Sequence, residues 1–175
     1  MNTLPKYHAI KVDEQKCFGC THCIKACPTE AIRVRRGKVS FLNDICIDCG
    51  ECITACTQKV FVPKSDEKED FDAFSLQIAI PSPVLYTQFG QDVPPQIVHQ
   101  ALKNIGFDEV VDLANITQQL GFVLLHHLKH DGMNKPLISS YCPTIVRYLQ
   151  VKYPNLVNHI EPLDVPLEIA AKEAK

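Results

Sequence analysis

CFGCTHCIKAC at residues 17–27 has the same cysteine spacing as CIDCGECITAC at residues 46–56. Each stretch reads C-x2-C-x2-C-x3-C; Pro28 follows the first stretch and Thr57 follows the second. The short gaps let a tight loop aim its sulfur atoms at one point, and the longer gap opens a helical turn that sends the last sulfur elsewhere. Soft thiolate ligands in this arrangement favour iron–sulfur clusters. The two stretches therefore predict a pair of clusters built on one internal repeat.

Three other uses of these cysteines fit the sequence less well. Disulfide bonds need an oxidising compartment, and residues 1–11 lack the apolar segment of a secretory signal. Zinc sites usually take C-x2-C pairs rather than longer runs. Buried structural cysteines would not repeat at matched offsets. The nine cysteines of the chain thus indicate metal ligation in a reducing cytoplasm.

The spacing resembles the C-x2-C-x2-C-x3-C-P motif of bacterial two-cluster ferredoxins. In that family the fourth cysteine of each run ligates the cluster of the other run. The resemblance covers residues 7–62, and Thr57 departs from the motif without removing a ligand. It implies two 4Fe–4S clusters with crossed ligand sets, Cys17, Cys20, Cys23 and Cys56 for the first and Cys46, Cys49, Cys52 and Cys27 for the second.

The repeat also predicts an α+β ferredoxin-like fold for residues 1–63. Each half should give a strand, a cysteine loop, a short helix and another strand. Alternating apolar residues over 31–41 predict a hairpin that turns at Gly37. Residues 60–62 should pair with the strand around Ile10 and Val12. The acidic residues 64–75 are interpreted as a solvated linker.

The pattern changes to alternating strands and helices over residues 76–175. Short apolar strands are predicted at 76–80, 110–113 and 136–140, and helices at 97–105, at 116–128, after Pro143 and at 165–175. Gly106 should end the first helix and Asn115 should cap the second. We expect Ile116, Leu120, Val123, Leu124 and Leu128 on the buried face of the second helix, and Ile169 inward in the last. Such alternation implies right-handed crossovers, and so a partial α/β domain with a parallel sheet.

Composition limits the partners of the chain. It has 175 residues, a net charge of −2 and no basic stripe, which argues against nucleic acid. No apolar run approaches the roughly 18 residues of a membrane-spanning helix, so no membrane partner is expected. No phosphate-binding glycine motif occurs either. The expected partners are redox proteins that donate or accept electrons in the cytoplasm.

Cys142 lies outside both runs, between a predicted strand and the helix after Pro143. Spacing alone leaves two uses open: a thiolate activated by the positive end of the helix, or a buried small hydrophobe. The wider segment resembles the first signature region of iron–iron hydrogenases. The matching stretches are SSYCP at 139–143, Y-P-x-L at 153–156, P-x3-P-x-E-I at 162–169 and, further upstream, SPV at 82–84.

In that family the last cysteine of the motif ligates the cubane part of the active-site cluster, and the resemblance gives this place to Cys142. The preceding cysteine relays protons, but Tyr141 stands there in this chain. A phenol with a pKa of about 10 is a poorer relay than a thiol near about 8.5, which favours the sensor-like branch of the family. The family's other cubane ligands lie in later motifs that do not occur before Lys175. We therefore expect a truncated or split chain that holds no active-site di-iron cluster by itself, and we nominate no catalytic residue.

Three functions follow from these patterns. The first is electron transfer through two 4Fe–4S clusters, as the N-terminal relay of a hydrogenase-like protein. The second is a share in a hydrogenase that further sequence or another chain completes. The third is a redox or H2 sensor, or an interaction protein, that carries a sensory segment or subunit. The cluster ligands by themselves favour electron transfer.

Overall fold

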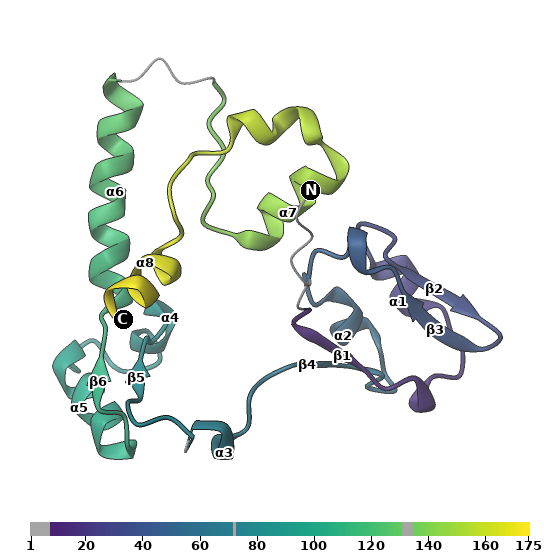
Figure 1. Ribbon diagram of the computed structural model, residues 1–175, viewed down its shortest axis with the longest axis horizontal. Helices are drawn as coiled ribbons and strands as arrows, with labels where there is room; N and C mark the ends of the chain where they lie inside the picture. The colour runs from purple at the N-terminus through teal and green to yellow at the C-terminus, as the bar shows by residue number, and fades with distance from the viewer. Residues whose placement is uncertain (1–7, 72, 131–134) are drawn as a thin grey trace. The chain divides into compact units, whose positions relative to one another are not determined.

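The computed structural model describes residues 8–71, 73–130 and 135–175 (Figure 1). The chain divides into two compact units: unit 1 comprises residues up to 66 together with 142–158, and unit 2 comprises 67–141 together with 159–175. Residues 142–158, which the sequence assigns to the second domain, thus group with the first unit. Residues 1–7, most of the stretch on which the prediction about a signal segment rests, lie outside the described residues.

Unit 1 shows the internal repeat directly. Its elements are β1 (Ile10–Val12), α1 (His22–Ala26), β2 (Ile32–Arg35), β3 (Lys38–Phe41), α2 (Glu51–Ala55), β4 (Phe61–Pro63) and α7 (Pro143–Lys152). Short 3-10 turns at Glu14–Lys16 and Asn43–Ile45 lead into the two cysteine loops. β1 pairs with β4 in antiparallel register, with Lys11 opposite Val62, so the predicted closure of the repeat is confirmed.

The hairpin predicted at Gly37 is also confirmed. β2 and β3 pair with Val34 opposite Val39, and the two residues between them, Arg36 and Gly37, have φ angles of 52° and 75°. Positive φ at both central positions is the geometry that matches the twist of paired strands. The hairpin places Lys38 at the start of β3, next to the first cysteine loop.

The core of unit 1 lies among the cysteines. Ile32 and Phe61 are each only 1% exposed, and they form one cluster with Val39, Val60, Cys23 and Cys52. Burying such large side chains stabilises a small domain by about 1.5–3 kcal/mol each. The cysteines are therefore part of the hydrophobic core, which holds Cys23 and Cys52 in place.

Unit 2 holds a small parallel pair of strands and several helices. Its elements are α3 (Lys68–Phe71), β5 (Ile78–Ala79), α4 (Pro83–Tyr86), α5 (Pro95–Ile105), β6 (Glu109–Val110), α6 (Leu113–His130) and α8 (Pro166–Glu173). The 3-10 helix Pro154–His159 belongs to unit 1 except for its last residue, His159. β5 and β6 are parallel, with Ile78 opposite Glu109, and α5 forms the connection between them. Gly106, at φ 129°, ends α5 as predicted.

Two local predictions in unit 2 are wrong. Leu113 does not belong to the second strand: it begins α6, and Asp112 rather than Asn115 caps that helix. The Oδ1 atom of Asp112 accepts from the N–H groups of Ala114 at 3.0 Å and Asn115 at 3.3 Å. The carboxylate of Asp112 lies just before the first helical residue, where it accepts from these backbone N–H groups and complements the positive helix end. Asn115 lies inside the first turn, so its side chain is not the cap.

The third strand, predicted at 136–140, is replaced by one isolated parallel bridge. Ile138 donates to the carbonyl of His159 at 2.8 Å and accepts from the N–H of Glu161 at 2.9 Å. Pro136 has no N–H to continue the ladder, and the Ser140 hydroxyl donates to the carbonyl of Leu163 at 2.8 Å. The parallel sheet of unit 2 therefore has two strands in the described residues.

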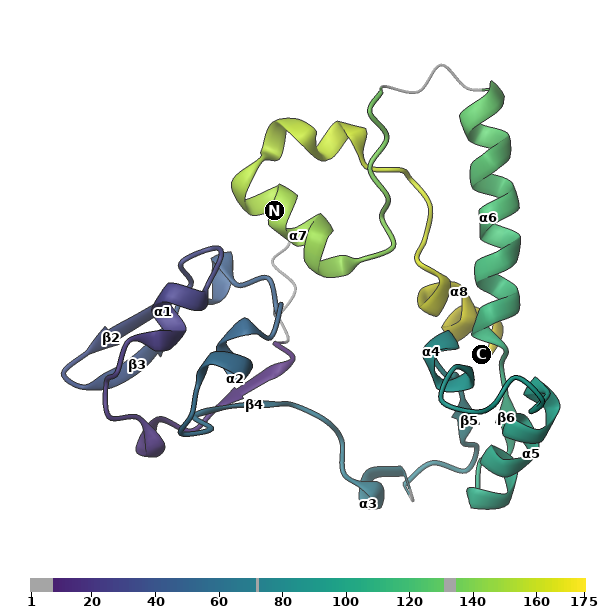
Figure 2. The same cartoon turned by 180° about the vertical axis from the view of Figure 1, so that it is seen from behind.

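Helix α6 is buried along only part of its length. Leu113 and Ile116 pack with Ala170 of α8, and Leu120 and Ile169 border this cluster. Figures 1 and 2 both show α8 against the N-terminal part of α6. Val123 and Leu128, predicted to be buried, are 42% and 45% exposed. No described element of unit 2 covers Val123 and Leu128 in the C-terminal part of α6. The apolar spacing therefore predicted a longer buried face than the helix has.

Among the described helices, none combines the length and the hydrophobicity that crossing a bilayer requires.

Candidate metal centres

The first cysteine loop lines a small cavity with four of the predicted ligands. The loop runs from the 3-10 turn at Glu14–Lys16 into α1, and Cys23 is buried in the first turn of that helix. The fourth cysteine comes from the other run, just after α2. Apolar side chains of β2 and β4 close the cavity, whose thiols are Cys17, Cys20, Cys23 and Cys56.

The second loop builds a matching cavity from the second half of the repeat. Cys52 is buried in the first turn of α2, and Cys27, just after α1, comes from the first run. Ile10 of β1, Ile32 of β2 and Phe41 of β3 line it, together with the thiols of Cys46, Cys49, Cys52 and Cys27. The structure thus gathers the eight cysteines into the crossed groups that the ferredoxin resemblance implies. The role of these thiols as ligands stays a prediction.

The two loops share one unusual backbone pattern. Gly19 and Thr21 have φ angles of 86° and 68°, and the equivalent Asp48 and Gly50 have 52° and 80°. Alternation of left-handed and right-handed residues curls a backbone around a concavity lined by N–H groups, which favours anions. A cluster bound by thiolates is such an anionic group, so the loop shape suits the predicted ligand.

Burial decides the protonation of the thiols. It raises the pKa of Cys23 and Cys46, and it raises the pKa of Cys52 to about 12, with Cys49 and Cys46 adding to the shift. Thiols of this kind are protonated at neutral pH unless a cation replaces the proton. Binding of iron therefore has to release protons, and the buried sulfur atoms suit a soft metal rather than a nucleophilic role.

Backbone N–H groups donate to three of the sulfur atoms. The N–H of Ala31 lies 3.2 Å from Cys27 Sγ, and the N–H of Val60 lies 3.4 Å from Cys56 Sγ, at the equivalent place in the repeat. A third N–H, from Asp48, donates to Cys46 Sγ at 3.4 Å. Such bonds stabilise thiolate sulfur and influence the reduction potential of a bound cluster.

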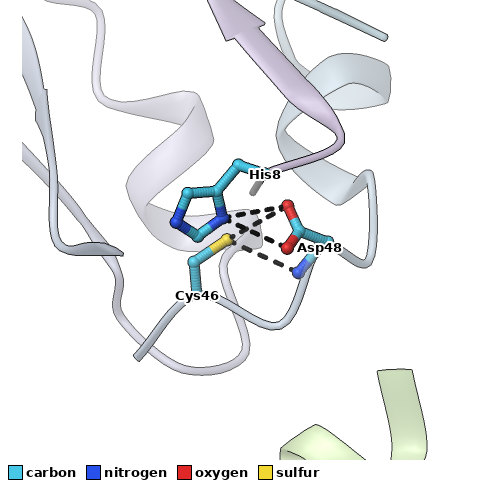
Figure 3. A group of neighbouring side chains, drawn as sticks. All are labelled: His8, Cys46 and Asp48. Atoms are coloured by element: carbon cyan, nitrogen blue, oxygen red, sulfur yellow. Dashed lines mark hydrogen bonds and ion pairs between the residues drawn. The ribbon is translucent and has the colours of Figure 1, made fainter. Parts of the chain in front are cut away.

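Asp48 joins the second loop to the N-terminal strand, as Figure 3 shows. Its carboxylate accepts from His8 Nδ1 at 3.1 and 3.2 Å and from the N–H of Ala9 at 3.2 Å. Its Oδ1 atom also lies 3.8 Å from Cys46 Sγ. Sequence reasoning missed both His8 and Asp48. The available signal was the equivalence of Asp48 with Gly19 between the first two cysteines of each run.

Lys38 was missed as well, and it supports the first loop. Its ammonium donates to the carbonyl oxygens of Cys17 at 2.9 Å, Glu14 at 3.1 Å and Gln15 at 3.3 Å. These carbonyls end the 3-10 turn that leads into the loop, so a β3 side chain holds the entrance of the first cysteine run.

Cys142 is not among the residues that line either cavity. It immediately precedes α7, and its thiol is exposed, so the alternative of a buried small hydrophobe is wrong. The neighbouring motif residues Ser139, Ser140 and Tyr141 line a cavity of about 180 Å³ in unit 2, beside the middle of α6 and Glu161. The role of Cys142 as a cubane ligand stays a prediction.

Comparison with known proteins agrees with this geometry. Residues 76–175 match the family model described as iron only hydrogenase large subunit, C-terminal domain, and residues 9–57 match the 4Fe-4S dicluster domain. The periplasmic [Fe] hydrogenase large subunit of Nitratidesulfovibrio vulgaris is 30% identical, over 97% of this chain and 45% of the relative. Iron hydrogenase 1 of Clostridium pasteurianum is 27% identical, over 95% of this chain and 34% of the relative.

A ferredoxin of Pyrobaculum islandicum is 30% identical over 38% of this chain and 63% of its own length. This chain therefore spans less than half the length of the two hydrogenase relatives.

Proposed function

Because this chain belongs to the family of the iron-only hydrogenase large subunit, we propose that it forms the N-terminal electron-relay part of a hydrogenase-like protein. Its residues 9–57 are a 4Fe–4S dicluster domain, the kind of domain that passes single electrons. One observation carries the proposal: two small cavities each combine three thiols of one run with the last thiol of the other.

We assign the crossed ligand sets to these cavities, with Cys17, Cys20, Cys23 and Cys56 in the first and Cys46, Cys49, Cys52 and Cys27 in the second. When bound, each 4Fe–4S cluster accepts and releases one electron. The chain positions the sulfur atoms by burying Cys23 and Cys52 in the core. Its backbone N–H groups stabilise the thiolates, and Phe61 and Ile32 exclude water between the loops.

Residues 76–175 are proposed to be the first part of the α/β hydrogenase domain, whose parallel sheet begins with β5 and β6. Residues 1–63 are then the ferredoxin-like domain and residues 64–75 the acidic linker. In the complete protein Cys142 would ligate the active-site cubane; its exposed thiol before α7 supports this role. The chain is not proposed to turn over hydrogen by itself, since a single thiol cannot hold that cluster.

The proposed partners are a redox protein that exchanges electrons with the clusters and the further sequence or chain that completes the hydrogenase domain. A reducing compartment, the cytoplasm, suits the many thiols. A relative from Methanosarcina acetivorans, named as part of an ion-translocating oxidoreductase complex, is 42% identical over 27% of this chain and 18% of its own length. This match supports the relay role more than a catalytic one.

Anaerobic purification of the full chain tests the proposal. We expect about eight iron atoms and about eight acid-labile sulfides per chain, the content of two cubes. A Cys142→Ala variant should have the same content, because the other thiols suffice. A chain that folds with zinc and without labile sulfide would overturn the proposal.

The second candidate function is hydrogen activation by an assembled protein. The match of residues 76–175 to the hydrogenase domain favours it. Joining the chain to a segment that supplies the remaining cubane cysteines should then produce hydrogen uptake or evolution, and Cys142→Ala should abolish it. If the assembled protein binds the clusters and stays inactive, the sensor function is the better description, in keeping with Tyr141 in the place of the relay cysteine.

A further inference from the structure

The two cysteine runs fold alike but carry opposite charges. Between its first and last cysteines, residues 17–27 contain His22 and Lys25 and no acid, whereas residues 46–56 contain Asp48 and Glu51 and no base. Glu51 also lines the second cavity. In the internal repeat, His22 and Glu51 occupy equivalent places, whereas Asp48 corresponds to Gly19 and Lys25 corresponds to Thr54.

The structure adds a cation to the first loop and crowds the position that corresponds to Asp48. The Lys38 ammonium lies 2.9 Å from the carbonyl oxygen of Cys17. Gly19 occupies the place that Asp48 has in the second loop, and a Cβ atom on Gly19 would lie 3.0 Å from the Cα atom of Gly37. The hairpin turn thus disfavours any side chain, a carboxylate included, at this position of the first loop.

The second loop accommodates the carboxylate and holds it against a ligand sulfur. Asp48 Oδ1 lies 3.8 Å from Cys46 Sγ (Figure 3). A metal-bound thiolate has no hydrogen to donate, so the carboxylate then depends on the N–H of Ala9 and on His8 Nδ1. These donors come from the start of β1, outside the cysteine run.

His8 contacts the carboxylate through one ring nitrogen. Its Nδ1 atom lies 3.1 Å from Asp48 Oδ2, whereas its Nε2 atom is buried and has no hydrogen-bond partner among the described residues. A ring with its proton on Nδ1 satisfies the contact with Asp48.

We propose that Asp48 and Lys38 make the two clusters unequal, so that the cluster at Cys46 is reduced at a lower potential than the cluster at Cys17. This inference rests on the proposed function. An added electron makes a cluster more negative, so a nearby carboxylate disfavours reduction and a nearby ammonium favours it. With both clusters bound, Lys38 would favour the first electron at the Cys17 site and Asp48 would disfavour it at the Cys46 site.

The two charges do not contribute equally. The side chain of Asp48 is 26% exposed, whereas Lys38 is exposed to solvent. Water and salt screen exposed charges more strongly than partly buried ones. The carboxylate should therefore account for the larger share of the difference in potential.

A redox titration of the anaerobically purified full chain, followed by paramagnetic resonance, tests the proposal. The unmodified chain should show two separate one-electron steps. Asp48→Asn should raise the lower step and leave the upper step in place; asparagine tolerates the left-handed backbone and can still accept from the N–H of Ala9. Lys38→Gln should lower the upper step by a smaller amount. Glu173→Gln, which neutralises an exposed acid at the end of α8, is the matched control and should move neither step.

Each outcome separates this inference from the function on which it rests. A chain without about eight irons contradicts the proposed function itself. With both clusters present, a lower step that stays in place in Asp48→Asn, or Asp48 and Lys38 variants that move the same step, overturns the inference alone. If Asp48→Asn loses a cluster, Asp48→Gly, which copies the residue of the first loop, replaces it and should show the same upward shift.

Discussion

Cys17 and Cys56 line the same cavity, although they are the first cysteine of the first run and the last cysteine of the second. The antiparallel pairing of β1 with β4 closes the repeat and brings the segments that carry them together. Neither half of the repeat can complete a group of thiols alone, so the two cavities form as one unit.

Because the ligand sets are crossed, the loss of one cysteine should remove the cluster of the other run's cavity or of its own, depending on its place in the run. Cys56→Ala should remove the cluster at Cys17, and Cys27→Ala should remove the cluster at Cys46, so iron falls from about eight to about four atoms per chain in each variant. Paramagnetic resonance should show different signals surviving in the two variants. If both variants keep the same signal, or if Cys56→Ala removes the signal that Cys46→Ala removes, the crossed assignment is wrong.

Phe61 should be the most costly core residue to truncate in unit 1. It is 1% exposed and packs in the core cluster that also contains Cys23 and Cys52. Phe61→Ala should lower the free energy of unfolding by about 3–5 kcal/mol through lost burial and the cavity left behind. Anaerobic denaturant titration measures this change. Phe122→Ala, at a phenylalanine that is 64% exposed on α6, should change it by less than about 0.5 kcal/mol.

Removal of the Asp112 side chain tests whether this residue, rather than Asn115, caps α6. Asp112→Ala loses two hydrogen bonds to the first helical amides and should cost about 1 kcal/mol of the free energy of unfolding. Asn115→Ala, at the residue that the sequence pattern predicted as the cap, should have a much smaller effect. An equal loss in both variants would show that Asp112 has no special role as the cap.

Tyr86 should make unit 2 sensitive to alkaline pH. Burial raises the pKa of its phenol above 10.0, and the negative charge of Asp112 adds to the shift. Its hydroxyl also lies 2.7 Å from His99 Nε2. The unfolded phenol ionises near 10.0 and the folded one only at higher pH. The stabilising contribution is therefore complete below pH 10 and is lost as the pH rises through the folded pKa.

Unfolding of the chain and of a Tyr86→Phe variant between about pH 9 and 12 measures this dependence. The stability of the variant should fall less steeply with pH than that of the unmodified chain. Equal slopes for the two proteins would show that ionisation of Tyr86 does not contribute.

Most of unit 1 was predictable because its signals are local. Matched cysteine spacing, a glycine in a two-residue turn and alternating apolar residues each act within a few positions of the chain. The hairpin of β2 and β3 and the pairing of β1 with β4 followed from such patterns. In unit 2 the same reasoning located α5 and its end at Gly106, where a left-handed C-terminal residue is a local requirement.

Predictions that depend on neighbours from elsewhere in the chain were less successful. The segment around Ile138 has the composition of a strand, but it finds a partner only at Ile160. The apolar spacing of α6 is continuous, yet α8 covers only the part near Ile116. Hydrophobic periodicity indicates which residues can be buried. Which of them are buried depends on the helices and strands that pack against them.

Residue type and short spacing are enough to identify the thiols of the repeat, the turns of the backbone and the families that the two parts resemble. The contact of Asp48 with His8, 40 residues earlier, and that of Lys38 with the carbonyl of Cys17, 21 residues earlier, are visible only once the chain is folded. Both contacts depend on how strands far apart in the chain are brought beside the cysteine loops. The charge that surrounds each group of thiols is therefore a property of the fold.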